Sequence, residues 1–390
     1  MSEIKSKRNV KIEIIRLIAC MAVIWYHIRE LPWKIDGELS ETAVFFECVC
    51  TICVMTFFLI TGFFIYNGKK SILGDWIALI KKFLSQVFVP FLFVVIFTII
   101  FHEYLISTQS FLYCVSHISL IKIFQSVFEC IRNYSTNNLP GSAAHLWYIF
   151  SYAFIIIVYP ITRYIMMKLP KWVGYAAILL LTICMVVNDY FLFFGNPSYN
   201  LIFKIIHKPV YYSAWGHVLY NDIMKKYIDE RQKDRSDKLF IINKPLFISS
   251  IIIYIITFIL LFKTQVAYYL GTNGEYVYTS WLSIYSLVLT TCFILFVYNI
   301  NLDRFLNEKI KSVIYYISSK TLGIYLIHYL IIVKLLSVGF QNIFTKNRPN
   351  IIYHLLYYIF YSLFIFIVTF LTLLIIEKIH KVVKSIVSKR

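Results

Sequence analysis

The stretch Ile12-Glu-Ile-Ile-Arg-Leu-Ile-Ala-Cys-Met-Ala-Val-Ile-Trp-Tyr-His-Ile28 is an apolar segment that contains both an arginine and a histidine. His27 follows Arg16 by 11 residues, which at about 100° per residue is three helical turns to within roughly 20°. Both side chains therefore share one stripe of a helix, roughly 16 Å apart along its axis. Ionisable residues inside a membrane segment are costly and usually face a protein interior or a water-filled path. The pair is therefore a candidate functional site.

Apolar segments of this kind recur along the whole chain of 390 residues. Hydrophobic residues make up 59% of the sequence and charged residues only 15%, a composition that excludes an ordinary soluble protein. Runs of about 20 apolar residues predict about ten transmembrane helices. We place them at residues 12–31, 43–66, 83–102, 145–164, 173–194, 201–220, 247–263, 280–299, 313–337 and 352–376. The sequence thus predicts an all-α, polytopic integral membrane protein that crosses the cell membrane many times.

The net charge of +18 is explained mainly by membrane topology. Of the 38 Lys and Arg residues, 26 lie in the six segments on the N-terminal side of the predicted membrane, and 7 lie in the opposite loops. The positive-inside rule then places both termini in the cytoplasm, as an even number of helices requires. We expect the lipid bilayer as the surroundings and no nucleic-acid partner. Some of the cations also suit anionic lipid heads or an anionic cosubstrate.

We interpret residues 1–390 as a single membrane domain with no separate soluble domain, because no long Gly/Ser linker or low-complexity tail interrupts the pattern. Cys48, Cys50 and Cys53 form a C-x-C-x-x-C run, but the run lies inside the second predicted helix and no paired histidine follows it. Packing of small residues between helices explains these cysteines better than a metal site. We expect no metal.

Several titratable residues from separate predicted helices fall at one depth near the outer face. With the helix directions given by the charge count, His27 lies near the outer end of the first helix and Glu47 one turn below the outer surface. His145 opens the fourth helix at the same side, and His328 lies in the outer half of the ninth. The alternatives are that a lone histidine is an interfacial anchor or a core residue, and that Glu47 reaches the headgroups.

These residue types suit acyl or proton transfer. A histidine with a pKa of about 6.5 accepts a hydroxyl proton at neutral pH and returns it to a leaving group. A buried arginine stays charged, and its planar fork suits phosphates or a developing oxyanion. A thioester donor that enters from the cytoplasm meets Arg16 first and brings its acyl carbon toward His27. Glu13 is one helical turn before Arg16, so an i,i+3 ion pair is its simplest use.

The Arg-x10-His spacing of Arg16 and His27 resembles the hallmark of the acyltransferase-3 family of multi-spanning membrane enzymes. Three further motifs follow in the expected order. They are Phe57-Phe-Leu-Ile-Thr-Gly-Phe63, His145-Leu-Trp-Tyr148 with Pro160, and Ser318-Ser-Lys-Thr-Leu-Gly-Ile-Tyr-Leu-Ile-His328. The resemblance covers nearly the whole chain.

The resemblance implies a membrane O-acyltransferase. Its expected donor is cytoplasmic acyl-CoA, with acetyl-CoA as the expected form, and its expected acceptor is a hydroxyl of a bacterial cell-envelope or extracellular glycan or lipid-linked sugar, as in O-acetylation of a polysaccharide. By this likeness His27 is the catalytic base and Arg16 is its partner in the donor channel. The residues expected to contact the acceptor substrate are Glu47, His145, Trp147 and His328.

The chain departs from the family at the start of the third predicted helix. Relatives often have paired arginines there before a proline, whereas this chain reads Lys81-Lys-Phe-Leu-Ser-Gln-Val-Phe-Val-Pro90, with Gln86 where the second arginine is expected. We expect Lys81 and Lys82 to meet the CoA phosphates as point charges without bidentate geometry.

The alternative function is a polytopic transporter or exporter of an envelope glycan precursor or small molecule, because buried charges also serve substrate and proton paths. Against it, the sequence has no pair of corresponding Gly/Pro-broken helices in two halves, and its motifs are asymmetric. A structural subunit of an envelope assembly leaves Arg16 without an explanation.

Overall fold

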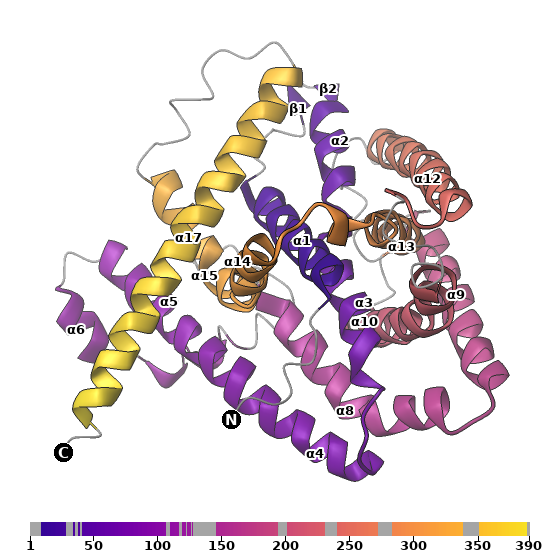
Figure 1. Cartoon of the computed structure of the whole chain (residues 1–390). Coiled ribbons are helices and arrows are strands. Elements are labelled where there is room, and N and C mark those ends of the chain that lie inside the picture. The colour runs from indigo at the N-terminus through magenta and orange to yellow at the C-terminus, as the bar shows by residue number, and fades with distance from the viewer. Residues whose placement is uncertain are drawn as a thin grey trace. The chain divides into compact units, whose positions relative to one another are not determined.

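A computed structural model of the protein describes residues 9–28, 34–35, 38–39, 41–106, 110–116, 119–121, 123–125, 127, 146–193, 201–230, 240–271, 283–337 and 351–387. Its elements follow one another as labelled in Figure 1. The helices are α1 (Val10–Ile28), α2 (Glu41–Cys50), α3 (Ile52–Ile65), α4 (Ile72–Phe83), α5 (Val89–Ile106), α6 (Phe111–Ser116), α8 (Trp147–Met167), α9 (Lys171–Phe193), α10 (Leu201–Val218), α12 (Lys244–Gly271), α13 (Ile284–Tyr298), α14 (Glu308–Ser318), α15 (Thr321–Ser337) and α17 (Ile351–Val387). The described residues also form two π-helices, η1 (Leu84–Phe88) and η3 (Leu219–Asp229), and a short 3-10 helix, η5 (Leu302–Arg304).

Most of the described chain is helical, and the one sheet among its residues is a small hairpin. In this hairpin, strand β1 (Lys34–Ile35) pairs antiparallel with β2 (Glu38–Leu39). Helices dominate because the bilayer core holds no water, so the backbone has to satisfy its own hydrogen bonds inside each spanning segment. The prediction of an all-α membrane protein is confirmed at this level.

Over the residues that the structure describes, each predicted membrane segment is mainly helical. Within the described residues, five helical stretches are long and apolar enough to cross a membrane. They are Val44–Ile65, Ile72–Ile100, Trp147–Met167, Lys244–Ala267 and Ile359–Ile379. The chain is thus a multi-pass membrane protein, while the number of about ten spans and the cytoplasmic termini stay predictions.

Two of the predicted segments, 43–66 and 313–337, are interrupted by a short break between two α-helices. Between α2 and α3, the amide nitrogen of Thr51 lies 3.3 Å from the carbonyl oxygen of Cys48, and the Thr51 hydroxyl donates to the same oxygen at 2.6 Å. Between α14 and α15, the amide of Lys320 donates to the Ile317 carbonyl at 2.9 Å. Short polar side chains that hydrogen-bond to nearby backbone carbonyls compete with the regular helix. Such a contact leaves no mark in the hydropathy of the segment, so the apolar pattern did not predict the break at Thr51.

The chain divides into two compact units. The first consists of Met1–Ala19, Leu31–Phe88 and Tyr148–Tyr315, and the second of Cys20–Glu30, Val89–Trp147 and Tyr316–Arg390. The continuous helix α1 belongs in part to each unit.

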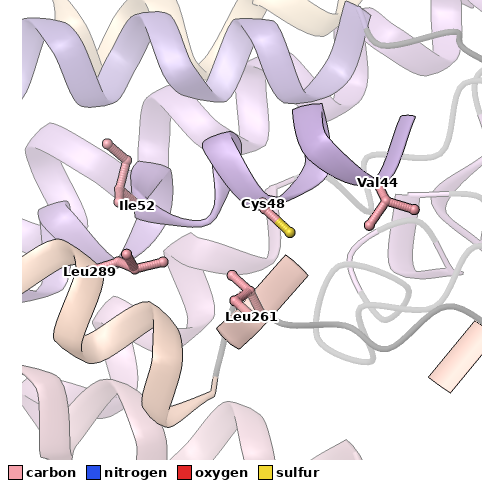
Figure 2. Close-up of a cluster of buried hydrophobic side chains, with 5 residues drawn as sticks. All are labelled: Val44, Cys48, Ile52, Leu261 and Leu289. Carbon is pink, nitrogen blue, oxygen red and sulfur yellow. The ribbon is translucent and has the colours of Figure 1, made fainter. Parts of the chain in front are cut away.

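Part of the core of the first unit forms where α2, the start of α3, α12 and α13 meet. The buried side chains there are Val44, Cys48, Ile52, Leu261 and Leu289. Figure 2 shows the Cys48 thiol directed toward Leu261 from a neighbouring helix. Cys48 is therefore an apolar packing residue, as the sequence indicated.

Two glycines bring α3 and α10 into close contact in the first unit. A Cβ atom at Gly62 would lie 1.8 Å from the carbonyl oxygen of Ser213, and one at Gly216 would lie 2.2 Å from that of Leu59. Each glycine therefore faces the backbone of the other helix, where no larger residue fits. This contact uses the glycine of the Phe57–Phe63 motif for packing.

Arg163, near the C-terminal end of α8, stabilises the turn between α3 and α4 through hydrogen bonds and an ion pair. Its guanidinium donates to the carbonyl oxygens of Gly68 at 2.6 Å and Lys70 at 3.1 Å, and it pairs with the Asp75 carboxylate at 2.5 Å. It also donates to the Tyr159 hydroxyl at 2.8 Å. A nearly buried arginine is stabilised when its planar fork meets several acceptors in this way, and here the result is a fixed start for α4.

In the second unit α15 packs antiparallel against α17. An ion pair joins Lys320 to Glu377, and Gly323 faces the side chain of Leu373, which lies 2.9 Å from where a Cβ would stand. The direction is antiparallel because later residues of α15 meet earlier residues of α17. This packing supports the helix that carries His328.

Candidate functional site

Helix α1 carries both residues of the opening motif without a break. It begins after Asn9, whose side-chain oxygen accepts from the amide of Lys11 at 3.0 Å and so caps the helix. The predicted segment 12–31 is helical as far as Ile28, where its described part ends. Arg16 lies in the part of α1 that belongs to the first unit, and His27 lies in the part that belongs to the second.

In the second unit the structure brings His27 close to His328 of α15. Their ring centroids are 5.1 Å apart with an interplanar angle of 51°. The ring of Tyr329 meets His27 edge-on at 5.4 Å. His27 is half-buried and His328 is fully buried. Two residues that the sequence named separately therefore form one cluster, which we call the histidine pair.

The backbone orients the His328 ring. Its Nδ1 lies 2.7 Å from the carbonyl oxygen of Tyr325, one turn earlier on α15. A carbonyl oxygen only accepts hydrogen bonds, so Nδ1 is the nitrogen that carries the hydrogen. In a neutral ring Nε2 is then the acceptor nitrogen. The histidine pair thus contains a ring whose tautomer is set by its own helix.

Arg16 forms an ion pair with an acidic residue of its own helix in the first unit. Its guanidinium pairs with the Glu13 carboxylate at 2.6 Å, which confirms the predicted i,i+3 ion pair. In the same unit, the ring of Tyr148 on α8 packs against the ring of Phe58 on α3, with 4.8 Å between the ring centroids. Tyr148 also contacts the ring of Phe57 at 6.0 Å. The Phe57–Phe63 motif and Tyr148 are therefore in contact.

The remaining predicted site residues fall into three groups. Glu47 on α2 is buried with 3% of its surface exposed, so within the described structure it faces protein. Trp147 is also buried, at the start of α8, while His145 lies outside the described residues. Lys81 and Lys82 are exposed in the last turn of α4, and neither belongs to the histidine pair or to the Glu13–Arg16 ion pair.

The structure also shows a buried cation to which the sequence interpretation gave no role. Lys208 in α10 has only 1% of its surface exposed. Arg16 became a candidate because an ionisable residue is costly within a membrane segment. The same argument applies to Lys208, so the sequence did contain a signal for this residue. Among the described residues there is no group of three or more His, Cys, Asp or Glu side chains arranged to hold a metal ion.

These features define a multi-pass membrane protein with a histidine pair at one part of its first helix and a partly buried arginine at another. The family model described as an acyltransferase domain, Acyl_transf_3, matches residues 9–376. The chain belongs to the acyltransferase-3 family, and the resemblance seen in its motifs is confirmed. Membership implies a membrane acyltransferase that uses an acyl donor and an acceptor. Comparison with curated proteins and with solved structures found no match.

Proposed function

We propose that the protein is a membrane O-acyltransferase that moves an acetyl group from cytoplasmic acetyl-CoA to a hydroxyl of a cell-envelope or extracellular glycan. The observation that carries the proposal is the contact between His27 and His328 in a chain of the acyltransferase-3 family. Two imidazoles side by side, one with its tautomer set by a carbonyl, supply a proton acceptor and a polar neighbour for a reacting hydroxyl.

In the proposed reaction His27 is the general base. Its imidazole takes the proton of the acceptor hydroxyl while the hydroxyl oxygen forms a bond to the thioester carbonyl carbon. The carbon–sulfur bond then breaks, the CoA thiolate leaves, and the imidazolium returns the proton to that sulfur. Because the Tyr325 carbonyl holds Nδ1 of His328, the acceptor Nε2 of the same ring is suited to orient His27 or the acceptor hydroxyl.

The other assigned residues divide between donor and acceptor. We assign Arg16 to the donor, where its guanidinium stabilises phosphate or thioester oxygens. Lys81 and Lys82 are exposed at the end of α4 and suit the CoA phosphates as point charges. The residues assigned to the acceptor are Glu47, His145, Trp147 and His328.

Labelled acetyl-CoA tests the proposed function. Inverted membrane vesicles that contain the protein receive acetyl-CoA labelled in the acetyl group, and the label is followed onto glycan. We expect label on the glycan only when the protein is present. Movement of an unlabelled glycan precursor across the membrane, with no dependence on acyl-CoA and no transfer of label, would overturn the acyltransferase proposal in favour of a transporter.

Replacing Arg16 by alanine is expected to raise the KM for acetyl-CoA by about 10- to 100-fold, the effect of losing one hydrogen bond to a charged group. The KM for the acceptor should change much less. Initial rates over a matrix of donor and acceptor concentrations measure both values. The control is Arg304→Ala, which removes an exposed arginine of η5 and should leave both values unchanged. An unchanged donor KM in Arg16→Ala would remove Arg16 from the donor site.

A further inference from the structure

The N-terminal end of α1 is held by a tyrosine of another helix in the first unit. The side-chain amide of Asn9 donates to the hydroxyl of Tyr298, the last residue of α13, at 2.9 Å. The ammonium of Lys11 lies 4.9 Å from the centre of the same ring. Lys11 is 2% exposed and Tyr298 is fully buried. Because one contact is to the hydroxyl and the other to the ring face, Tyr298 restrains the rotation of α1 as well as its position.

Asp229 at the end of η3 fixes the direction of the Tyr298 hydroxyl. That hydroxyl donates to the two carboxylate oxygens at 2.9 and 3.1 Å, so its oxygen is left to accept from Asn9. A hydrogen bond to a charged acceptor is stronger than one between neutral groups. We call the arrangement of Asn9, Tyr298 and Asp229 the α1 socket, in which Asn9 bonds to Tyr298 and Tyr298 bonds to Asp229.

Neighbouring backbone makes the α1 socket rigid. Asn299, next to Tyr298, accepts from the amide of Asn243 at 2.7 Å, and its own side-chain amide donates to the Asn243 carbonyl at 2.8 Å. The Asn243 side chain donates in turn to the Tyr227 carbonyl of η3 at 3.0 Å. The ends of α13 and η3 are thus bonded through one asparagine, and Tyr298 and Asp229 lie beside that connection.

The α1 socket acts on the face of α1 that carries Arg16. Glu13 follows Asn9 by four residues and Arg16 follows it by seven, so all three lie within about 40° of one line along the helix. Glu13 is the ion-pair partner of Arg16. A rotation of α1 that breaks the Asn9–Tyr298 bond therefore also turns the Glu13–Arg16 pair.

We propose that Tyr298 and Asp229 are positioning residues that set the rotation of α1 and thereby aim Arg16 at the acyl donor. The role of Arg16 at the acyl donor rests on the proposed function. Displacing a positioned group by about 1 Å lowers activity by as much as 100-fold, so a small rotation has a measurable effect.

Tyr298→Phe is the decisive variant, because it removes the hydroxyl and keeps the ring beneath Lys11. We expect it to raise the KM for acetyl-CoA about tenfold with little change in the acceptor KM, and to speed hydrogen exchange of the first-turn amides of α1 without speeding that of α13. Asp229→Asn keeps a carbonyl oxygen for the tyrosine hydroxyl, so it should retain more activity than Asp229→Ala. The control is Tyr227→Phe, the same substitution at an exposed tyrosine of η3.

The possible outcomes distinguish a failure of the positioning role of the α1 socket from a failure of the proposed function. Faster exchange in α1 together with an unchanged donor KM in Tyr298→Phe would overturn the positioning role, and so would unchanged exchange. An equal loss of activity in Asp229→Asn and Asp229→Ala would count against it as well. If the wild-type protein neither binds acetyl-CoA nor transfers acetyl, the proposed function fails. The exchange measurement then still decides whether Tyr298 holds α1.

Discussion

His27→Ala is expected to abolish acyl transfer in membranes that contain normal amounts of folded protein. A general base contributes about 10²- to 10⁴-fold to a rate, and alanine offers no proton acceptor in its place. The loss should appear in kcat, since the base acts on the reacting hydroxyl rather than on the donor. Label transfer from acetyl-CoA to glycan measures the rate, and size-exclusion chromatography in detergent measures the folded fraction.

His27→Gln sharpens this expectation. Glutamine keeps much of the volume of the side chain and its hydrogen bonding, but it does not accept a proton at neutral pH. If histidine is the base, Gln and Ala variants are equally inactive, whereas a residue that only packs against His328 and Tyr329 would tolerate Gln. Full acetyl transfer by either variant would contradict the assignment of His27 as the catalytic base.

The second large effect is expected on folding, at the α3–α10 contact. Gly62→Leu or Gly216→Leu places a side chain where the carbonyl oxygen of the facing helix would lie 1.8 or 2.2 Å from its Cβ. Because the obstacle is backbone, the helices have to separate, and we expect destabilisation of about 3 kcal/mol or more. Loss of monodisperse protein in detergent and a lowered thermal midpoint measure it.

Gly174→Ala provides the matched control. A Cβ at Gly174 would meet the flexible side chain of Met166 at 3.4 Å, an ordinary contact. Gly174 lies inside α9, where alanine is favoured over glycine by up to about 1 kcal/mol. This variant should therefore be neutral or slightly more stable. Normal folding of Gly62→Leu would show that α3 and α10 do not need their close contact.

The helical architecture and the Arg16–His27 motif were predictable because both depend on local patterns. Apolar runs of membrane length locate helices, and a helix of known rise and rotation places Arg16, Glu13 and His27 on one stripe. The family could be recognised for the same reason, since its motifs are short and keep their order along the chain. Helix boundaries were harder to predict, as Thr51 shows, because the break between α2 and α3 lies inside one mainly apolar segment and hydropathy does not mark it.

By itself the sequence determined that the chain is a helical multi-pass membrane protein of the acyltransferase-3 family. It also determined that the first helix carries Arg16 and His27, two polar residues that are energetically costly to place in a membrane. Only the tertiary structure decided that His27 meets His328, which follows it by 301 residues, and that Tyr298 holds Asn9. It also decided that Glu47 and Lys208 are buried in protein. Hydropathy reports how each segment partitions into the membrane, whereas side-chain contacts between helices depend on how the helices pack, which no local pattern encodes.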